Sequence, residues 1–275
     1  LSSIIGEGRA GHKMDREARQ KSRYTGAMDW KDEGIVLSAH KHGESSAVVT
    51  LLTREHGRHA GLVRGGAGKR ARGIYQPGNH VSAQWRARLA EQLGSYQCEL
   101  TGASAAHLLD DRLRLAGLSA ACALTEAALP EREPHGVLFE MFTGLLAALD
   151  RDDWQFLYVR WELDLLRELG FGLDLSSCAA TGRTDQLAYV SPKSGRAVSL
   201  TAGEPYRRAL LALPGFLLNG EGAKIAEEGL EAAGSVNDGL ALTGYFLEHF
   251  VFAPNNRGLP AARQRLVERL AKDPN

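Results

Sequence analysis

Eight lysine or arginine side chains lie between positions 54 and 88, where the only acid is Glu55. Ammonium and guanidinium groups neutralise phosphates, and a cluster of them with few acids is typical of a surface that binds a nucleic-acid backbone. The sequence therefore predicts a nucleic-acid-binding surface in this stretch. We expect its phosphate contacts to be Arg58, Arg64, Lys69, Arg70, Arg72, Arg86 and Arg88.

The charge distribution supports this interpretation, because the formal net charge of the whole chain is zero. Residues 1–27 carry six basic and three acidic residues, residues 28–102 carry ten and seven, and residues 103–275 carry seventeen and twenty-three. A merely solvated basic face is the alternative, since arginine is frequent throughout the chain. Frequency explains the choice of arginine over lysine, but it does not explain the shortage of acids between 54 and 88.

A glycine-rich loop at 65–70, GlyGlyAlaGlyLysArg, has the composition of a phosphate-binding loop. A Walker A loop needs glycine at position 63 and serine or threonine at position 70, where this chain has Val63 and Arg70. A dinucleotide fingerprint needs a helix after the glycines, but the chain reaches Pro77 without a helical pattern. We therefore expect the glycines to let the main chain approach a nucleic-acid strand, and we predict no nucleotide hydrolysis.

No catalytic constellation accompanies this loop. The nine histidines form no helical pair with a carboxylate, and no GlyXaaSerXaaGly motif occurs. Three separated cysteines, Cys98, Cys122 and Cys178, indicate a reducing cytoplasm rather than a disulfide framework. The sequence predicts a protein that is not an enzyme and that has neither cofactor nor membrane span.

Strand patterns fill residues 33–101 and predict a small antiparallel barrel of five strands. Residues 80–89 alternate strictly, so Arg86 and Arg88 are expected to point outward and Trp85 into the core. Trp30 and Tyr75 lie outside the strict alternation and could stack on bases.

Helical patterns begin after residue 102, so the fold class is α+β, with a barrel domain at 28–102 and a helical domain at 103–275. Residues 172–202 interrupt the helices with a predicted hairpin. The stripe of Trp154, Tyr158 and Trp161 is expected to pack in the helical core. The first expected helix ends near residue 130. Two more are expected at 136–150 and 154–169, and helices resume near 204–213, 220–232, 236–253 and 260–271.

The first 27 residues have no apolar period, and we expect them to be a disordered basic extension. Met28 opens the better patterned stretch, which suggests that the natural start lies there. A basic arm that contacts nucleic acid is the alternative.

Four segments resemble the RecO family of bacterial DNA repair proteins: residues 28–37, 61–70, 72–79 and 161–178. Their combined order is more specific than any one of them, and the similarity spans most of residues 28–271. The resemblance implies an N-terminal OB-fold and a helical domain. It also implies binding of single- and double-stranded DNA, strand annealing, and work with RecR to help RecA displace single-strand-binding protein. Contact with the acidic C-terminal tail of that protein is implied as well, at positions that no motif assigns. We expect the chain alone to be a monomer, at the nucleoid.

The sequence departs from this family at one point. Many relatives carry a four-cysteine zinc site after the segment that ends at Asp174. Here Cys178 stands in the first pair, but Thr181 and Gly182 follow and no second pair occurs. Because zinc held by one thiolate is not credible, we predict a hairpin without metal at 172–202.

Two other function classes fit the same residues. A basic barrel face could dock an acidic partner, which would make the protein an interaction adaptor. An OB module could also bind RNA, because grooves directed at the backbone tolerate both sugars.

Overall fold

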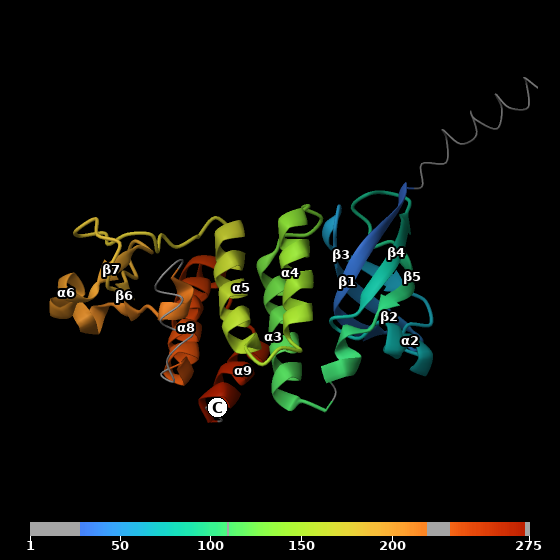
Figure 1. The fold of residues 1–275 in the computed structure, drawn as a ribbon. Coiled ribbons are helices and arrows are strands. Elements are labelled where there is room, and N and C mark those ends of the chain that lie inside the picture. Colours follow the sequence, from blue (N-terminus) through green and yellow to red (C-terminus); the bar gives the residue numbers. More distant parts are fainter. Residues whose placement is uncertain (1–27, 109, 219–231, 273–275) are drawn as a thin grey trace, which may run out of the picture.

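The computed structural model describes residues 28–108, 110–218 and 232–272. A barrel of five strands lies at one end, a layer of helices follows, and a small sheet lies at the far end (Figure 1). The α+β fold class is therefore confirmed. The expected extension at 1–27 and all but the last residue of the expected helix at 220–232 lie outside the described residues.

The barrel closes in the order β1-β2-β3-β5-β4, the arrangement of an OB-fold. Its strands are β1 (Met28–His42), β2 (Ser46–Thr53), β3 (Gly57–Val63), β4 (His80–Ala87) and β5 (Ser95–Gly102). The long β1 closes it, because the residues from Met28 to Ile35 pair with β4 and those from Gly34 to His42 pair with β2.

Alternation on β4 is confirmed. Val81, Ala83 and Trp85 are buried, whereas Gln84 and Arg86 are exposed. The strand ends at Ala87, so the predicted alternation does not continue to Leu89, which is 58% exposed. The large indole of Trp85 fills the barrel interior, and its Nε1 donates a hydrogen bond to the carbonyl of Leu93 at 3.0 Å. The buried polar atom is thus satisfied, as a core tryptophan requires.

One short helix in the barrel domain was not predicted. Helix α2 (Lys69–Ile74) lies between β3 and β4, where the sequence pattern indicated no helix before Pro77. It was missed because it has no buried residue and therefore no apolar stripe. A dinucleotide site stays excluded, because β3 pairs with β2 and β5 and no parallel β3–β4 pair exists in the barrel.

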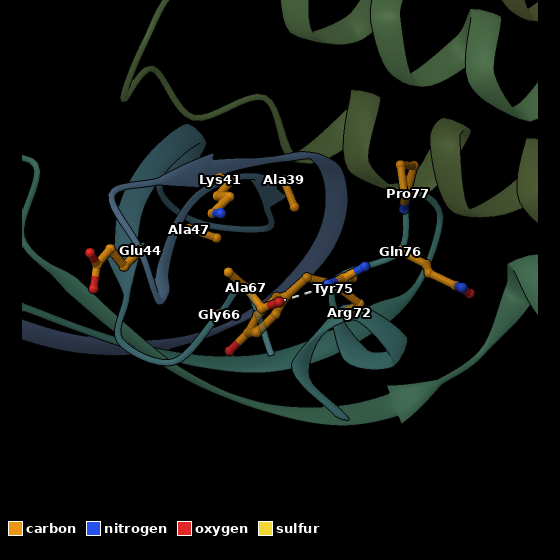
Figure 2. A pocket seen from close by; sticks show the side chains of 10 residues that line it. All are labelled: Ala39, Lys41, Glu44, Ala47, Gly66, Ala67, Arg72, Tyr75, Gln76 and Pro77. Atoms are coloured by element: carbon orange, nitrogen blue, oxygen red, sulfur yellow. Dashed lines mark hydrogen bonds between the residues drawn. The ribbon is translucent and has the colours of Figure 1, made fainter. Parts of the chain in front are cut away.

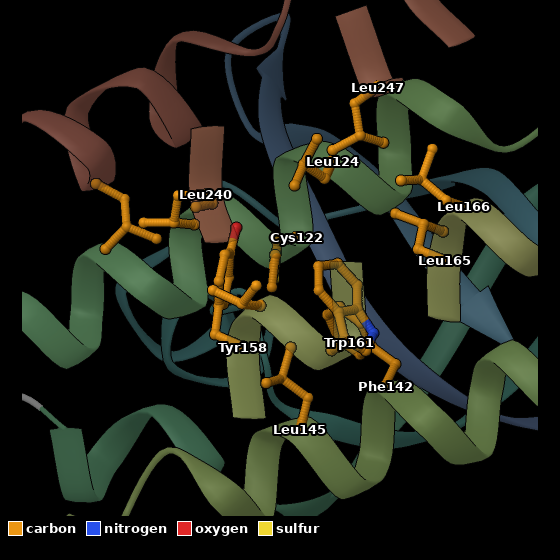
Figure 3. Packing of buried hydrophobic residues seen from close by; sticks show 14 of the residues in the cluster. Cys122, Leu124, Phe142, Leu145, Tyr158, Trp161, Leu165, Leu166, Leu240 and Leu247 are labelled. Carbon is orange, nitrogen blue, oxygen red and sulfur yellow. The ribbon is translucent and has the colours of Figure 1, made fainter. Parts of the chain in front are cut away.

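The long helices of the second domain are α3 (Arg112–Ala128), α4 (Gly136–Ala148), α5 (Trp154–Glu168), α8 (Ala232–Phe246) and α9 (Ala261–Lys272), and α6 (Leu200–Gly203) is a short one. Asp111 caps α3, since its carboxylate accepts hydrogen bonds from the backbone N–H groups of Leu113 and Arg114 at 2.9 Å. The aromatic stripe of α5 is buried as predicted, and Figure 3 shows Tyr158 and Trp161 among the leucines of the neighbouring helices.

A buried ion pair links three of these helices. Arg263 of α9 donates to both carboxylate oxygens of Glu162 on α5 at 2.8 Å, and it also contacts the hydroxyl of Thr243 on α8. The side chains of Glu162 and Arg263 are 0% and 4% exposed, so each charge depends on the other for compensation.

The predicted hairpin is present as β6 (Leu187–Val190) and β7 (Ala197–Ser199), and the two-residue strand β8 (Leu211–Ala212) pairs with β6. The helix expected at 204–213 is wrong. A 3-10 helix spans Glu204–Ala209, and the chain then enters β8, where Leu211 and Ala212 pair with Val190 and Tyr189 of β6.

The barrel packs on the helices through the outward face of two strands. Ile35, Leu37 and Leu52 are at most 2% exposed and belong to the same apolar cluster as the helical core, whereas Val36 and Leu51 belong to the barrel core. This explains why the run at 35–37 does not alternate between apolar and polar. We call this surface, together with Arg58 of β3, which pairs in register with Leu52, the docked face.

Candidate nucleic-acid interface

Four predicted phosphate contacts lie together at the α2 end of the barrel. They are Arg64, Lys69, Arg70 and Arg72, which we call the α2 basic cluster. All four are exposed, and none forms an ion pair with a carboxylate among the residues that the structure describes. Free exposed cations of this kind are available to neutralise phosphates.

A turn that contains several glycines positions the cluster. Gly65 has φ +72°, a conformation that favours glycine, and Gly68 precedes the first turn of α2. The backbone N–H of Ala67 donates to the carbonyl of Ser45 at 2.9 Å, which fastens this turn to the β1–β2 hairpin. The hairpin and α2 are therefore held beside each other.

A groove of about 640 Å³ lies between them (Figure 2). Its rim carries the cations of Lys41 and Arg72, and Glu44 is the one acid among its lining residues. The Nε of Arg72 donates to the carbonyl of Ala67 at 3.1 Å, so the guanidinium is oriented by the loop. The lining is otherwise mostly small or buried: Ala39, Ala47, Gly66, Ala67, Tyr75, Gln76 and Pro77.

Arg58 lies elsewhere, on the docked face. Its Nε donates to the carbonyl of Leu129 at 2.8 Å, and its guanidinium lies 3.4 Å from the carboxylate of Glu131. Arg54, also in the basic stretch, contacts the carboxylates of Glu33 and Glu140. Both arginines join the barrel to the helical domain, and neither lies with the α2 basic cluster.

Arg86 and Arg88 form a separate group at the other end of β1. Arg86 pairs in register with Asp29, and its guanidinium lies 3.8 Å from that carboxylate. Arg88 follows the end of β4 and is exposed. The groove, by contrast, lies beside Lys41 near the C-terminal end of β1, so the seven predicted contacts occupy three places.

The two aromatic residues expected to stack on bases are packed within the protein instead. Tyr75 is 6% exposed and belongs to the barrel core, where burial raises the pKa of its hydroxyl. The indole of Trp30 stacks on the imidazole of His56, with ring centroids 4.1 Å apart, and lies 5.6 Å from Trp85. The position of Trp30 and Tyr75 outside the alternating pattern could not show whether their rings are open to solvent or packed at the end of the barrel core.

Sequence reasoning missed Lys41 and Glu44, which line the groove. The signal was present, because a lysine between two histidines comes directly before a glycine turn at residues 40–43. Lys41 lies outside the acid-poor stretch at 54–88, and only the closure of the barrel brings it beside α2.

Cys178 is the one cysteine at the predicted degenerate zinc site. Burial would raise the pKa of its thiol, but hydrogen bonds from Ser199 and Thr181 and from backbone N–H groups lower that pKa to about 6. In the described ranges, no group of three or more histidine, cysteine or acidic side chains could hold a metal ion. A single thiolate does not fit zinc, and absence of metal stays a prediction that zinc analysis tests.

None of the helices in the described part of the chain combines the length and apolar character needed to cross a membrane.

Comparisons with known proteins match both domains. The model of the N-terminal domain of recombination protein O matches residues 28–103, and the model of its C-terminal domain matches residues 109–257. The chain is 59% identical to the DNA repair protein RecO of Rhodospirillum centenum over 89% of this chain and 96% of that protein. It is 53% identical to that of Rhodospirillum rubrum and 54% identical to that of Phenylobacterium zucineum, over 89% of this chain and 97% and 98% of those proteins. The chain therefore belongs to the RecO family of recombination proteins.

Proposed function

We propose that this chain is a non-catalytic DNA-binding mediator of recombination in DNA repair. It would anneal complementary strands and, with RecR, help to load RecA onto DNA coated by single-strand-binding protein. Family membership supports the role in repair and recombination. This function would place the protein in the cytoplasm, at the nucleoid.

The observation that carries the binding step is the α2 basic cluster. Four exposed cations extend from one end of an OB-type barrel without a carboxylate partner among the described residues, beside a groove whose rim adds Lys41. Such a surface attracts a phosphate backbone whatever the base sequence. Arg86 and Arg88 would extend the contact along the barrel, whereas the internal bonds of Arg58 support a structural role.

Replacement of Lys69, Arg70 and Arg72 by glutamate tests the proposal. We expect the affinity for bare oligonucleotides to fall, and the slope of log K against log salt to decrease by a little under one unit per lost phosphate contact. Fluorescence anisotropy over a salt series measures both quantities.

A matched control is available on the helical domain. Replacement of Lys193, Arg207 and Arg208 by glutamate changes the net charge by the same amount as the test variant. These three residues are exposed and lie far from the barrel. The control should retain nearly all of the affinity and the slope. If the two triple variants lose binding equally, overall charge rather than the α2 basic cluster governs it.

The adaptor alternative predicts that the purified chain does not bind bare oligonucleotides without a partner. Competition between DNA and RNA strands of equal length separates the RNA alternative. An annealing assay on strands coated with single-strand-binding protein then tests the mediator step.

A further inference from the structure

We propose that the groove between the β1–β2 hairpin and α2 accepts one unstacked nucleotide, so that this end of the barrel selects single-stranded nucleic acid over duplex. The inference rests on the proposed function and deepens it, because it assigns the kind of strand that the α2 basic cluster holds.

The groove has the size for such a ligand. Its volume of about 640 Å³ lies within the roughly 300–1,000 Å³ of pockets that hold small ligands. Its walls come from two segments far apart in sequence, the hairpin with Ala39, Lys41 and Glu44 on one side and residues 66–77 on the other. The Ala67–Ser45 hydrogen bond ties the walls together, which indicates that the groove exists before a strand binds.

The space depends on residues without long side chains. A Cβ atom at Gly66 would lie 2.9 Å from the Cβ of Ala47 and 3.0 Å from the carbonyl oxygen of Val63, so glycine at this position lets the turn pack directly on the barrel. Ala39 is exposed on β1 and lines the groove, where a larger residue would occupy the opening. Small residues therefore keep room for a planar base.

The charges suit a single strand. Lys41 and Arg72 lie on the two walls, so they could hold the phosphates on either side of an inserted base. A base in a duplex is stacked and paired, and its extrusion costs a few kcal/mol. The duplex could still contact the exposed cations, but it could not fill the groove without that cost.

Replacement of Ala39 by phenylalanine tests the proposal without a change of charge. The position is exposed on a strand, where an aromatic residue is tolerated. We expect the full chain to bind a labelled single strand roughly tenfold more weakly, the equivalent of one lost base contact, while its affinity for the duplex of the same length changes less than about twofold. The strands should exceed the roughly 4–16 nucleotides that one OB-fold covers.

Gln97→Phe, at an exposed residue of β5 outside the groove, is the matched control and should leave both affinities unchanged. Thermal unfolding checks that each variant folds, and Ala67→Phe replaces Ala39→Phe if the latter does not. Equal loss of single-strand and duplex binding, or no loss of either, would overturn the proposal. Failure of the unmodified protein to bind either nucleic acid would instead refute the proposed function itself.

Discussion

The docked face and the α2 end of the barrel use the same type of residue for different purposes. Arg58 on the docked face is 18% exposed at its side chain and bonds to the helical domain. Arg70 on α2 is exposed and has no ion pair among the described residues. Clustered arginines in a sequence therefore form a free basic surface only where folding leaves them without hydrogen-bond acceptors.

The largest effect is expected from the apolar part of the docked face. Leu52 is fully buried against the helical core, so Leu52→Ala should lower the free energy of unfolding by about 2–5 kcal/mol. Denaturant titration measures the change. Leu89→Ala, at a residue that is 58% exposed, is the control and should cost less than about 0.5 kcal/mol. If Leu52→Ala and Leu89→Ala lowered the free energy of unfolding equally, the two domains would not share a core.

Arg58 and Arg70 should separate stability from binding. Arg58→Ala leaves the carbonyl of Leu129 without its donor and should lower the free energy of unfolding by about 1–3 kcal/mol, with no change in the salt slope of DNA binding. Arg70→Ala should leave stability unchanged and reduce the slope by a little under one unit. The reverse result would place the phosphate contacts on the docked face.

A histidine buried in the barrel, His59, should make stability depend on pH. Burial lowers the pKa of His59 to about 4, and its Nδ1 lies 2.9 Å from the hydroxyl of Tyr96. The unfolded chain binds the proton at a pKa of about 6.5, so the free energy of unfolding should fall as the pH decreases from about 6.5 to about 4. His59→Gln should flatten that dependence in denaturant titrations across this range. An equally steep dependence in the variant would assign the effect to another group.

The smallest effect is expected at Glu44. Glu44 is an exposed acid among the lining residues of the groove, so Glu44→Gln should strengthen binding of a single strand by a few-fold, an exposed charge effect of less than about 1 kcal/mol. Glu91→Gln removes an exposed acid outside the groove and should change the affinity less. Weaker binding in Glu44→Gln would contradict the prediction that this carboxylate repels the phosphates of the strand.

The sequence predicted those parts of the fold that follow from local periodicity. The alternation on β4 placed Trp85 inside and Arg86 outside, and the stripe on α5 placed Tyr158 and Trp161 in the core. Helix α2 and strand β8 were missed because each is too short to show a period. Tertiary contacts, rather than propensity, fix such elements.

The candidate site was predictable in composition but not in arrangement. The pattern of charges identified Lys69, Arg70 and Arg72, yet it could not separate them from Arg58, whose acceptor at Leu129 lies 71 residues further along the chain. Lys41 reaches the groove only because β1 curves around the barrel to bring its end beside α2. Contacts between distant segments carry no local signal.

The position of Ile35 and Leu37 within β1 has a consequence for anyone who divides the molecule. Both side chains belong to the strand that closes the barrel, yet they are buried among the helices. A fragment that stops after Gly102 would keep its hydrogen-bonded strands and present a bare apolar patch to water, which invites self-association. Heat or protease should accordingly act on the barrel and the helices together rather than release the barrel as a stable product.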